Sequence, residues 1–109
     1  MNDLLRVQQL LHEIPPLMRE LMLWNETPPD AAAFESSEPF CIDTMVASEW
    51  LQWIFLPRML ALLEGNMTLP SRSSVAPYFE EALKEYEQDP KALLVLLQQI
   101  DDLLNKDNQ

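Results

Sequence analysis

Glycine, cysteine and histidine are almost absent from this 109-residue chain, which contains one of each. Phosphate-cradling loops need several glycines, because glycine lets the backbone turn tightly and approach a ligand closely. The composition therefore excludes a Rossmann loop and a P-loop. The single Cys41 allows no intrachain disulfide, and the single His12 cannot form a multi-histidine metal site. We interpret Cys41 as a buried structural thiol and His12 as a solvated side chain.

Basic residues are also scarce. The chain has 7 Lys and Arg against 18 Asp and Glu, a formal net charge of -11, and no two basic residues are adjacent. Such a field repels phosphate backbones, and nucleic-acid binding usually draws on a basic stripe. We therefore expect no direct binding to RNA, DNA or an anionic membrane. A basic protein surface is a better electrostatic match, although the charge could serve only solubility.

Long apolar runs and targeting signals are lacking too. The most apolar stretch, residues 50–63, is too short to span a bilayer and is interrupted by Gln52, Pro57 and Arg58. Residues 1–6 lack the basic and apolar pattern of a signal peptide. We expect a cytoplasmic protein that does not span a membrane.

Amphipathic helices dominate what is present, since 48% of the residues are hydrophobic and no segment alternates like a strand. The first helix is predicted from about Asp3 to Trp24. Its inward positions are Leu4, Val7, Leu11, Ile14, Met18 and Leu21. The pair Pro15-Pro16 lies inside it, and two missing N–H donors predict a bend there. The apolar spacing keeps its phase across the pair, so we expect no reversal.

Residues 25–43 form a long connection with three prolines and no sustained period. Long structureless loops are uncommon in compact domains unless they are functional or disordered. The aromatic residues Phe34 and Phe40 are expected to pin this loop to the core.

The second helix is predicted over residues 45–64, with Asp43 or Thr44 as its N-cap and Gly65 as its stop. Apolar residues surround nearly its whole circumference, which predicts burial on most sides. We therefore expect this helix to be the centre of the fold. Pro57, inside it, is expected to bend it.

Two shorter helices follow. Pro77 falls in the first turn of the third, where its missing donor costs little. The pair Asp89-Pro90 predicts the start of the fourth, which runs to about Asn105. Residues 106–109 are expected to fray.

These segments predict one all-α domain over residues 1–109. Its expected architecture is a compact four-helix bundle, with the long loop 25–43 between helices 1 and 2 and a proline-bent central helix 2. An exposed part of the leucine stripe on the first or fourth helix could also form a homo-oligomer.

Polar residues around the second helix are the best candidates for a binding surface. Asp43 and Glu49 flank its start, where they either cap the helix or project into a pocket beside Trp50 and Trp53. Arg58 lies among apolar neighbours and must snorkel to water, find a carboxylate or bind an anion. Glu49 is out of phase with Arg58, so a loop acid is an equally good partner.

Aromatic residues at helical spacing are usually core, but three tryptophans exceed what a domain this small needs. The candidate binding surface comprises Asp43, Glu49, Trp50, Trp53, Arg58 and Tyr78. We predict no catalytic residue, no metal ligand and no cofactor.

Several strings of residues stand together with a characteristic order and spacing. They are Pro39-Phe40, Asp43-Thr44-Met45, Glu49-Trp50-Leu51-Gln52-Trp53, Pro57-Arg58-Met59, Leu69-Pro70 and Val75-Ala76-Pro77-Tyr78. The chain resembles the YqcC-like family of small bacterial proteins in these strings, although the pair Pro15-Pro16 is not a feature of that family. The resemblance implies a helical bundle of unknown function, often encoded beside tRNA pseudouridine synthase C.

The chain does not itself have the features of that enzyme. A pseudouridine synthase needs a catalytic aspartate in an Arg-Leu-Asp type of motif on a much larger mixed α/β scaffold, and this sequence has no such string. An accessory role is what remains, and it rests on gene proximity.

Three hypotheses follow. The first is a non-catalytic interaction or accessory module whose partner is a cytoplasmic protein, either the synthase or another basic RNA-handling protein. The alternative is a small-molecule or anion pocket formed by Arg58, Asp43, Trp50 and Trp53. An enzyme acting through Asp43 or Glu49 ranks well below both.

Overall fold

The computed structural model describes residues 2–106, which form helices and no strand. The predicted all-α fold is confirmed. Fraying at residues 107–109 lies outside the described residues. The elements are α1 (Asn2–Glu20), the 3₁₀ turns η1 (Ala31–Glu35) and η2 (Pro39–Cys41), α2 (Ala47–Trp50), the π-helical η3 (Leu51–Phe55), α3 (Leu56–Glu64), α4 (Val75–Ala82) and α5 (Lys91–Asn105). Within the described chain, no helix is both long enough and apolar enough to cross a membrane.

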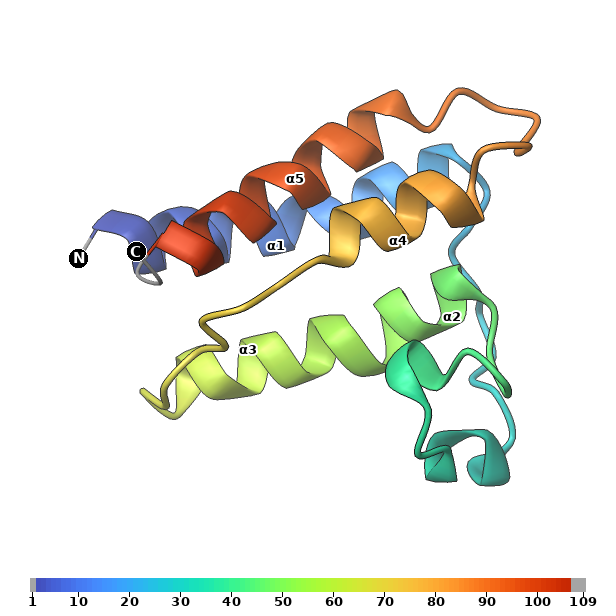
Figure 1. Cartoon of the computed structure of the whole chain (residues 1–109), viewed down its shortest axis with the longest axis horizontal. Coiled ribbons are helices and arrows are strands. Elements are labelled where there is room, and N and C mark those ends of the chain that lie inside the picture. The colour runs from blue at the N-terminus through green and yellow to red at the C-terminus, as the bar shows by residue number, and fades with distance from the viewer. Residues whose placement is uncertain (1, 107–109) are drawn as a thin grey trace.

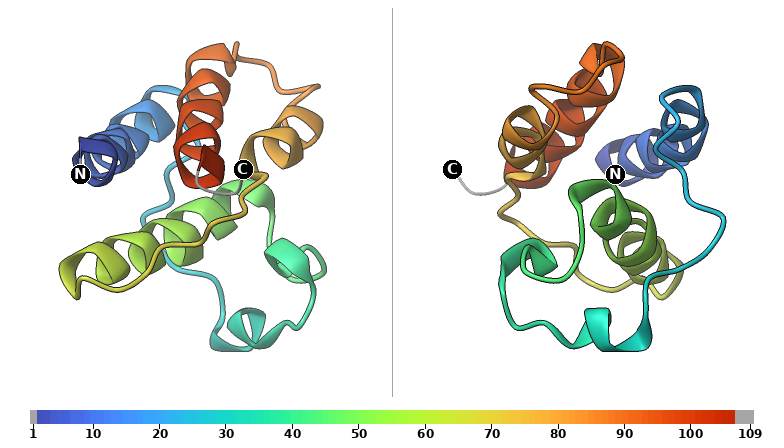
Figure 2. Two further views of the ribbon diagram at one scale, coloured as in Figure 1. Left: turned by 60° about the vertical axis from the view of Figure 1, so that its left-hand side comes forward. Right: turned by 90° about the vertical axis from the view of Figure 1, so that its right-hand side faces the viewer.

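The helices form two layers (Figure 1). In one layer α5 lies between α1 and α4, and it packs against both (Figure 2, left). The continuous arm of α2, η3 and α3 crosses beneath this layer and packs against α1. The arm therefore keeps one side toward solvent, where Pro57, Arg58 and Ala61 are exposed. Fewer sides of the arm are buried than its apolar sequence suggests, because only one layer of helices packs against it.

The core is formed mainly by the facing stripes of α1 and α5. These stripes contain the buried residues Val7, Leu10, Leu11, Ile14 and Met18 of α1, and Leu93, Leu96, Leu97, Ile100 and Leu104 of α5. The predicted inward position of Leu4 is wrong, since its side chain is 54% exposed. The other helices do not cover the first turn of α1. The apolar stripe of this helix therefore continues there onto exposed surface.

The pair Pro15-Pro16 does not divide α1, which remains helical through both residues. The helix ends earlier than predicted, at Glu20, in a Schellman motif. In that motif the N–H of Met22 donates to the carbonyl of Arg19 (3.1 Å), and the N–H of Leu23 donates to the carbonyl of Met18 (2.8 Å). Met22 takes the left-handed position that glycine normally occupies, with φ 62°.

A π-helical turn precedes Pro57 in the long arm. The N–H of Leu56 donates to the carbonyl of Leu51, five residues earlier, and α3 then continues past the proline. Proline has no N–H and its ring clashes with the carbonyl four residues before it. A wider turn ahead of Pro57 gives that ring room, so the expected bend takes the form of a π-helical segment.

The start of this arm differs from the sequence prediction, whereas its end agrees with it, because α3 ends at Glu64 with Gly65 as the C-cap. Neither Asp43 nor Thr44 caps its start; instead the N–H of Val46 donates to Glu49 Oε1 (3.1 Å). The favoured interpretation of Glu49 as a capping group is therefore confirmed. At the far end Asn66 (φ 54°), rather than Gly65 (φ -89°), takes the left-handed position.

The connection between α1 and α2 is fixed at several points. Buried Gln52 accepts a hydrogen bond from the N–H of Asn25 (2.8 Å) and donates to the carbonyl of the same residue (2.7 Å). The hydroxyl of Thr44 donates to the carbonyl of Ala33 (2.8 Å). Of the two expected pins, Phe40 packs against the core, whereas Phe34 is exposed. The predicted loop is thus an ordered segment with two 3₁₀ turns.

Candidate functional site

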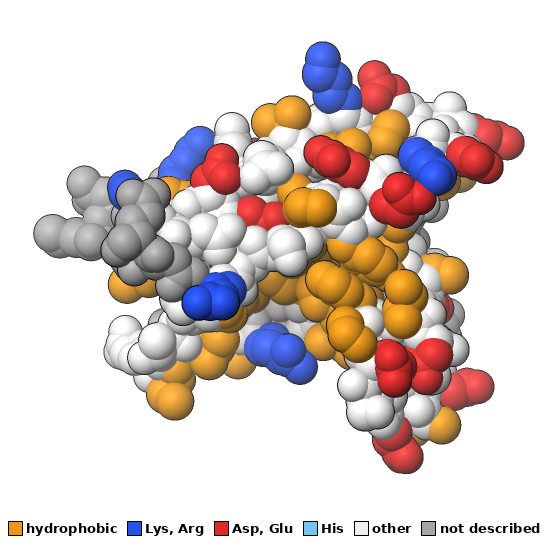
Figure 3. Space-filling model, viewed as in Figure 1, with side chains coloured by type: hydrophobic (Ala, Val, Ile, Leu, Met, Phe, Trp, Pro, Cys, Tyr) orange, Lys and Arg blue, Asp and Glu red, His pale blue; other side chains and the backbone are white. Residues whose placement is uncertain are grey.

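A groove of about 230 Å³ opens between the α2–α3 arm, η2 and the segment that leads into α4. We call it the arginine–aromatic groove. Its lining residues are Phe40, Trp50, Phe55, Arg58, Met59, Pro70, Arg72, Ser73, Ser74, Val75 and Leu104. The space-filling view shows the corresponding face, where hydrophobic side chains gather between the two layers with basic side chains beside them (Figure 3).

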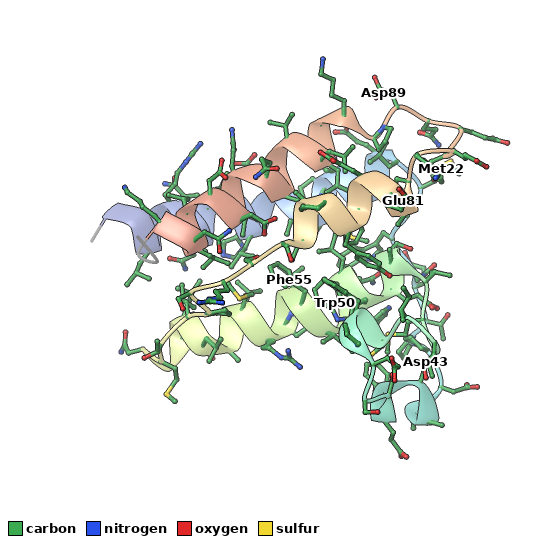
Figure 4. All side chains as sticks on the ribbon, viewed as in Figure 1. Met22, Asp43, Trp50, Phe55, Glu81 and Asp89 are labelled. Carbon is green, nitrogen blue, oxygen red and sulfur yellow. The ribbon has the colours of Figure 1, made fainter. Side chains whose placement is uncertain are left out.

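Aromatic rings from three elements form one wall of the groove. Phe40 stacks on Tyr78 with ring centroids 4.2 Å apart, and it meets Trp50 edge-on at 4.8 Å. Trp50 in turn contacts Phe55 at 5.3 Å. Trp50 and Phe55 lie between the arm and α4 (Figure 4). Burial in this cluster raises the pKa of Tyr78 above its ordinary value. The contacts join η2, α4 and the arm into one surface.

The backbone that presents Phe40 is strained. Phe40 and Cys41 have φ values of 58° and 48°, in the left-handed region. This conformation costs residues with a side chain about 1–2 kcal/mol each. The N–H of Cys41 donates to the carbonyl of Glu38 (3.0 Å), and the ring contacts of Phe40 hold the other side. Strain of this kind clusters at ligand clamps, where the surrounding structure maintains it.

Two arginines, Arg58 of α3 and Arg72 of the segment before α4, lie at the groove. Both are exposed, and no ion pair joins either one to a carboxylate in the described part of the chain. Neither Asp43 nor Glu49, the acids nearest to the start of the α2–α3 arm, pairs with Arg58, whose side chain reaches solvent. Among residues 2–106, two cationic groups therefore lie beside an apolar wall with no paired carboxylate, in a chain of net charge -11.

A clamp from α5 holds the backbone next to Arg72. The carboxylate of Asp101 accepts hydrogen bonds from the Ser73 hydroxyl and from the N–H groups of Val75 (3.2 Å) and Ala76 (2.8 Å). Asn105, one turn later, exchanges two hydrogen bonds with the backbone of Ser73, at 2.6 and 2.8 Å. The clamp caps the N-terminus of α4 and holds the segment that carries Arg72.

Asp101 is 1% exposed, and the sequence analysis did not single it out. One signal could have identified it. Asp101 comes four residues after Leu97 and three before Leu104, which places it on the buried stripe of α5. A carboxylate on such a stripe needs several donors, and the N–H groups at the start of α4 provide them.

The structure brings together only part of the predicted binding surface. Trp50 and Arg58 line the groove, and Tyr78 reaches it through its stack on Phe40. Arg72, Phe40 and Phe55 also line it, and of these the sequence analysis named only Phe40, as a residue that pins the loop. The other three predicted members are absent from the lining: Asp43, Glu49 and Trp53.

These three have local contacts instead. Asp43 is exposed and accepts a hydrogen bond from the Ser36 hydroxyl (2.5 Å). Glu49 caps the arm, as described above. Trp53 is half-buried in η3, and its indole Nε1 is buried without a hydrogen-bond partner in the described structure.

The groove has the chemistry of a binding site. Its lining contains no Asp, Glu, His or Cys, and its hydroxyl groups are those of Ser73 and Ser74. Across residues 2–106, no cluster of three His, Cys, Asp or Glu side chains could hold a metal ion. Guanidinium groups beside aromatic rings suit a ligand that combines negative charge with apolar surface.

Comparisons with known proteins agree with the sequence resemblance. Residues 6–103 match the profile of the DUF446 family, which is described as tRNA pseudouridine synthase C. An uncharacterised protein of Haemophilus influenzae is 47% identical over 100 residues, covering 92% of this chain and 93% of the relative. The uncharacterised protein YqcC of Escherichia coli is 38% identical over 102 residues, covering 94% of each chain.

The solution NMR structure of E. coli YqcC has the same fold, with a TM-score of 0.83 at 37% identity over 98% of this chain and 92% of that one. A third relative differs in size. It is a protein of Pectobacterium carotovorum named tRNA pseudouridine synthase C, 51% identical over 65 residues, and the match covers 60% of this chain but 17% of that protein.

Proposed function

We propose that this chain, which belongs to the DUF446 family, is a non-catalytic accessory module that binds a tRNA pseudouridine synthase. We further propose that the arginine–aromatic groove is the place where the synthase docks. The resulting pair would act in tRNA modification, with the chemistry on the synthase and the binding surface on this chain.

The observation that carries the proposal is the Pectobacterium relative. A 65-residue stretch related to this chain covers only 17% of a protein that bears the synthase name. The related segment is therefore part of a polypeptide several times longer. Covalent linkage gives two modules a high effective concentration, an advantage when the two work in contact. Where the modules are separate chains, a docking surface has to replace the linker.

The groove supports a binding role over a catalytic one. Pseudouridine synthases depend on a catalytic aspartate, and the groove lining contains no carboxylate. The nearby buried carboxylate of Asp101 is occupied by three donors from the start of α4. These contacts give Asp101 a structural role at the start of α4.

The charge distribution suits this partner as well. A net charge of -11 favours approach to an RNA-handling enzyme with basic surface. Arg58 and Arg72 place two positive charges at one groove of this otherwise acidic chain. Opposite charges at a single point fix the register of two docking proteins, whereas a uniform field only attracts them.

A pull-down at physiological salt tests the proposal, with the synthase of the same host as the prey. The tagged wild-type chain should retain the synthase, and the double variant Arg58→Ala/Arg72→Ala should retain much less. The matched control, Arg6→Ala/Lys91→Ala, removes the same charge from exposed sites outside the groove and should behave like the wild type. No retention by the wild-type chain would overturn the proposal.

A second candidate function is binding of a free anionic small molecule. Arg58, which has no ion pair within the described residues, and the ring of Trp50 favour it. Asp43 and Trp53, which the sequence assigned to such a pocket, do not take part. A thermal-shift screen of small aromatic carboxylates tests this function. It requires a ligand that stabilises the wild-type chain and does not stabilise the double arginine variant.

A further inference from the structure

We propose that the arginine–aromatic groove accepts one large apolar side chain together with an adjacent carboxylate, both supplied by a short acidic segment of the partner protein. This inference rests on the function proposed above and specifies what the docking segment must look like. It follows from the size of the groove, its unpaired charges and its rigidity, taken in turn.

The volume limits the occupant. Sites for drug-sized ligands usually measure about 300–1,000 Å³, whereas this groove measures about 230 Å³. A helix or a whole nucleotide is too large to enter. One aromatic or branched aliphatic side chain is of the right size, and the rings of Phe40, Trp50 and Phe55 give it an apolar wall.

The charges select what lies beside that side chain. Arg58 and Arg72 make no ion pair with any carboxylate of residues 2–106, so the described part of the chain leaves their charges free for a ligand. A guanidinium group binds a carboxylate through two parallel hydrogen bonds. A phosphodiester backbone offers similar oxygens, but its dense charge is repelled by the surrounding acidic surface. One or two carboxylates on a mainly apolar segment bring less repulsion.

The groove is also held in shape before any ligand enters. The Asp101 and Asn105 clamp fixes the backbone at Ser73, next to Arg72. On the opposite wall, the strained turn holds Phe40 against Trp50. A site that is already ordered avoids much of the entropy cost of binding, so a short segment can dock with useful affinity.

The proposal predicts which peptides bind. Overlapping 15-residue peptides that tile the synthase, titrated into the intact chain, should bind only where Asp or Glu adjoins Leu, Phe, Tyr or Trp. In a binding peptide, replacing the acid by its amide or the apolar residue by alanine should each weaken binding by about tenfold. Arg58→Ala and Arg72→Ala should do the same, and Arg6→Ala should not.

The outcomes separate this inference from the proposed function. If the intact synthase binds the chain equally well after Arg58→Ala and Arg72→Ala, the inference is wrong and the accessory role stands. If acidic, apolar peptides bind in the groove but the intact synthase does not bind, the accessory role is wrong. If free phenylpropionate binds as tightly as the best peptide, the occupant is a small molecule and the inference is wrong.

Discussion

Asp101 on α5 accepts a hydrogen bond from the hydroxyl of Ser73, which lies 28 residues earlier in the chain. This contact ties the last helix to the segment that carries Arg72 and leads into α4. It makes one wall of the groove depend on a carboxylate that lies outside it. The clamp is therefore both a stabilising feature of the fold and a positioning device for the candidate site.

Replacing Asp101 by Asn should destabilise the chain by about 3 kcal/mol, because a buried carboxylate loses its charge and an amide donor faces backbone N–H groups. Urea unfolding followed by circular dichroism measures the effect. Asp102→Asn is the matched control, since Asp102 is exposed and bonds only to Gln98 in the described contacts. Equal stability losses in the two variants would refute the clamp.

Met22→Gly should stabilise the chain by about 0.5–1 kcal/mol, because glycine accepts the left-handed conformation at the end of α1 without steric cost. The side chain is 78% exposed, so little packing is lost with it. Met22→Ala removes the same side chain but leaves the strain, and its stability should match the wild type. Thermal unfolding of the three proteins compares them, and a gain shared by Met22→Ala would point away from backbone strain.

Phe40→Ala should lower stability by about 1–2 kcal/mol, because it removes the stack on Tyr78 and the edge contact with Trp50. Phe34→Ala, in the same loop, should have little effect because Phe34 is exposed. The tryptophan fluorescence, to which Trp50 contributes, should also shift in the first variant and remain unchanged in the second. Similar unfolding midpoints for both variants would show that Phe40 is not the residue that pins the loop.

The stability of the chain should fall as the pH rises above 10, in part through Tyr78. Burial raises the pKa of Tyr78 in the folded state above its ordinary value of 10.0. Between the two values the folded state binds more protons than the unfolded state, so the free energy of unfolding decreases as the pH rises. Tyr78→Phe should reduce this slope in urea unfolding from pH 9 to pH 11. Identical slopes would remove Tyr78 as a cause.

The sequence predicted the helices well where a buried stripe is long and regular. Val7, Leu11 and Ile14 mark α1, and Leu93 and Leu97 mark α5, because one face of each helix is covered along most of its length. The ends were less predictable. Their geometry depends on single backbone conformations that many residue types can adopt when packing compensates.

The candidate site was predictable only in part. Arg58 stood out because a cation among apolar neighbours is unusual, and Trp50 because of its residue type. Arg72 lies in a loop with no periodic pattern, and nothing local links it to Arg58, fourteen positions earlier. Their convergence depends on the clamp by Asp101, which is a tertiary contact. Helical periodicity could identify the elements but could not bring these two cations to one groove.

The most direct test of the central claim is a calorimetric titration of the same-host synthase with three forms of this chain. These are the wild type, Arg58→Ala/Arg72→Ala and Arg6→Ala/Lys91→Ala. We predict saturable binding by the wild type and the control, and a loss of at least about tenfold, or ~1.4 kcal/mol, for the groove variant. No heat of binding with the wild type at tens of micromolar, or equal affinities for all three forms, would contradict the account.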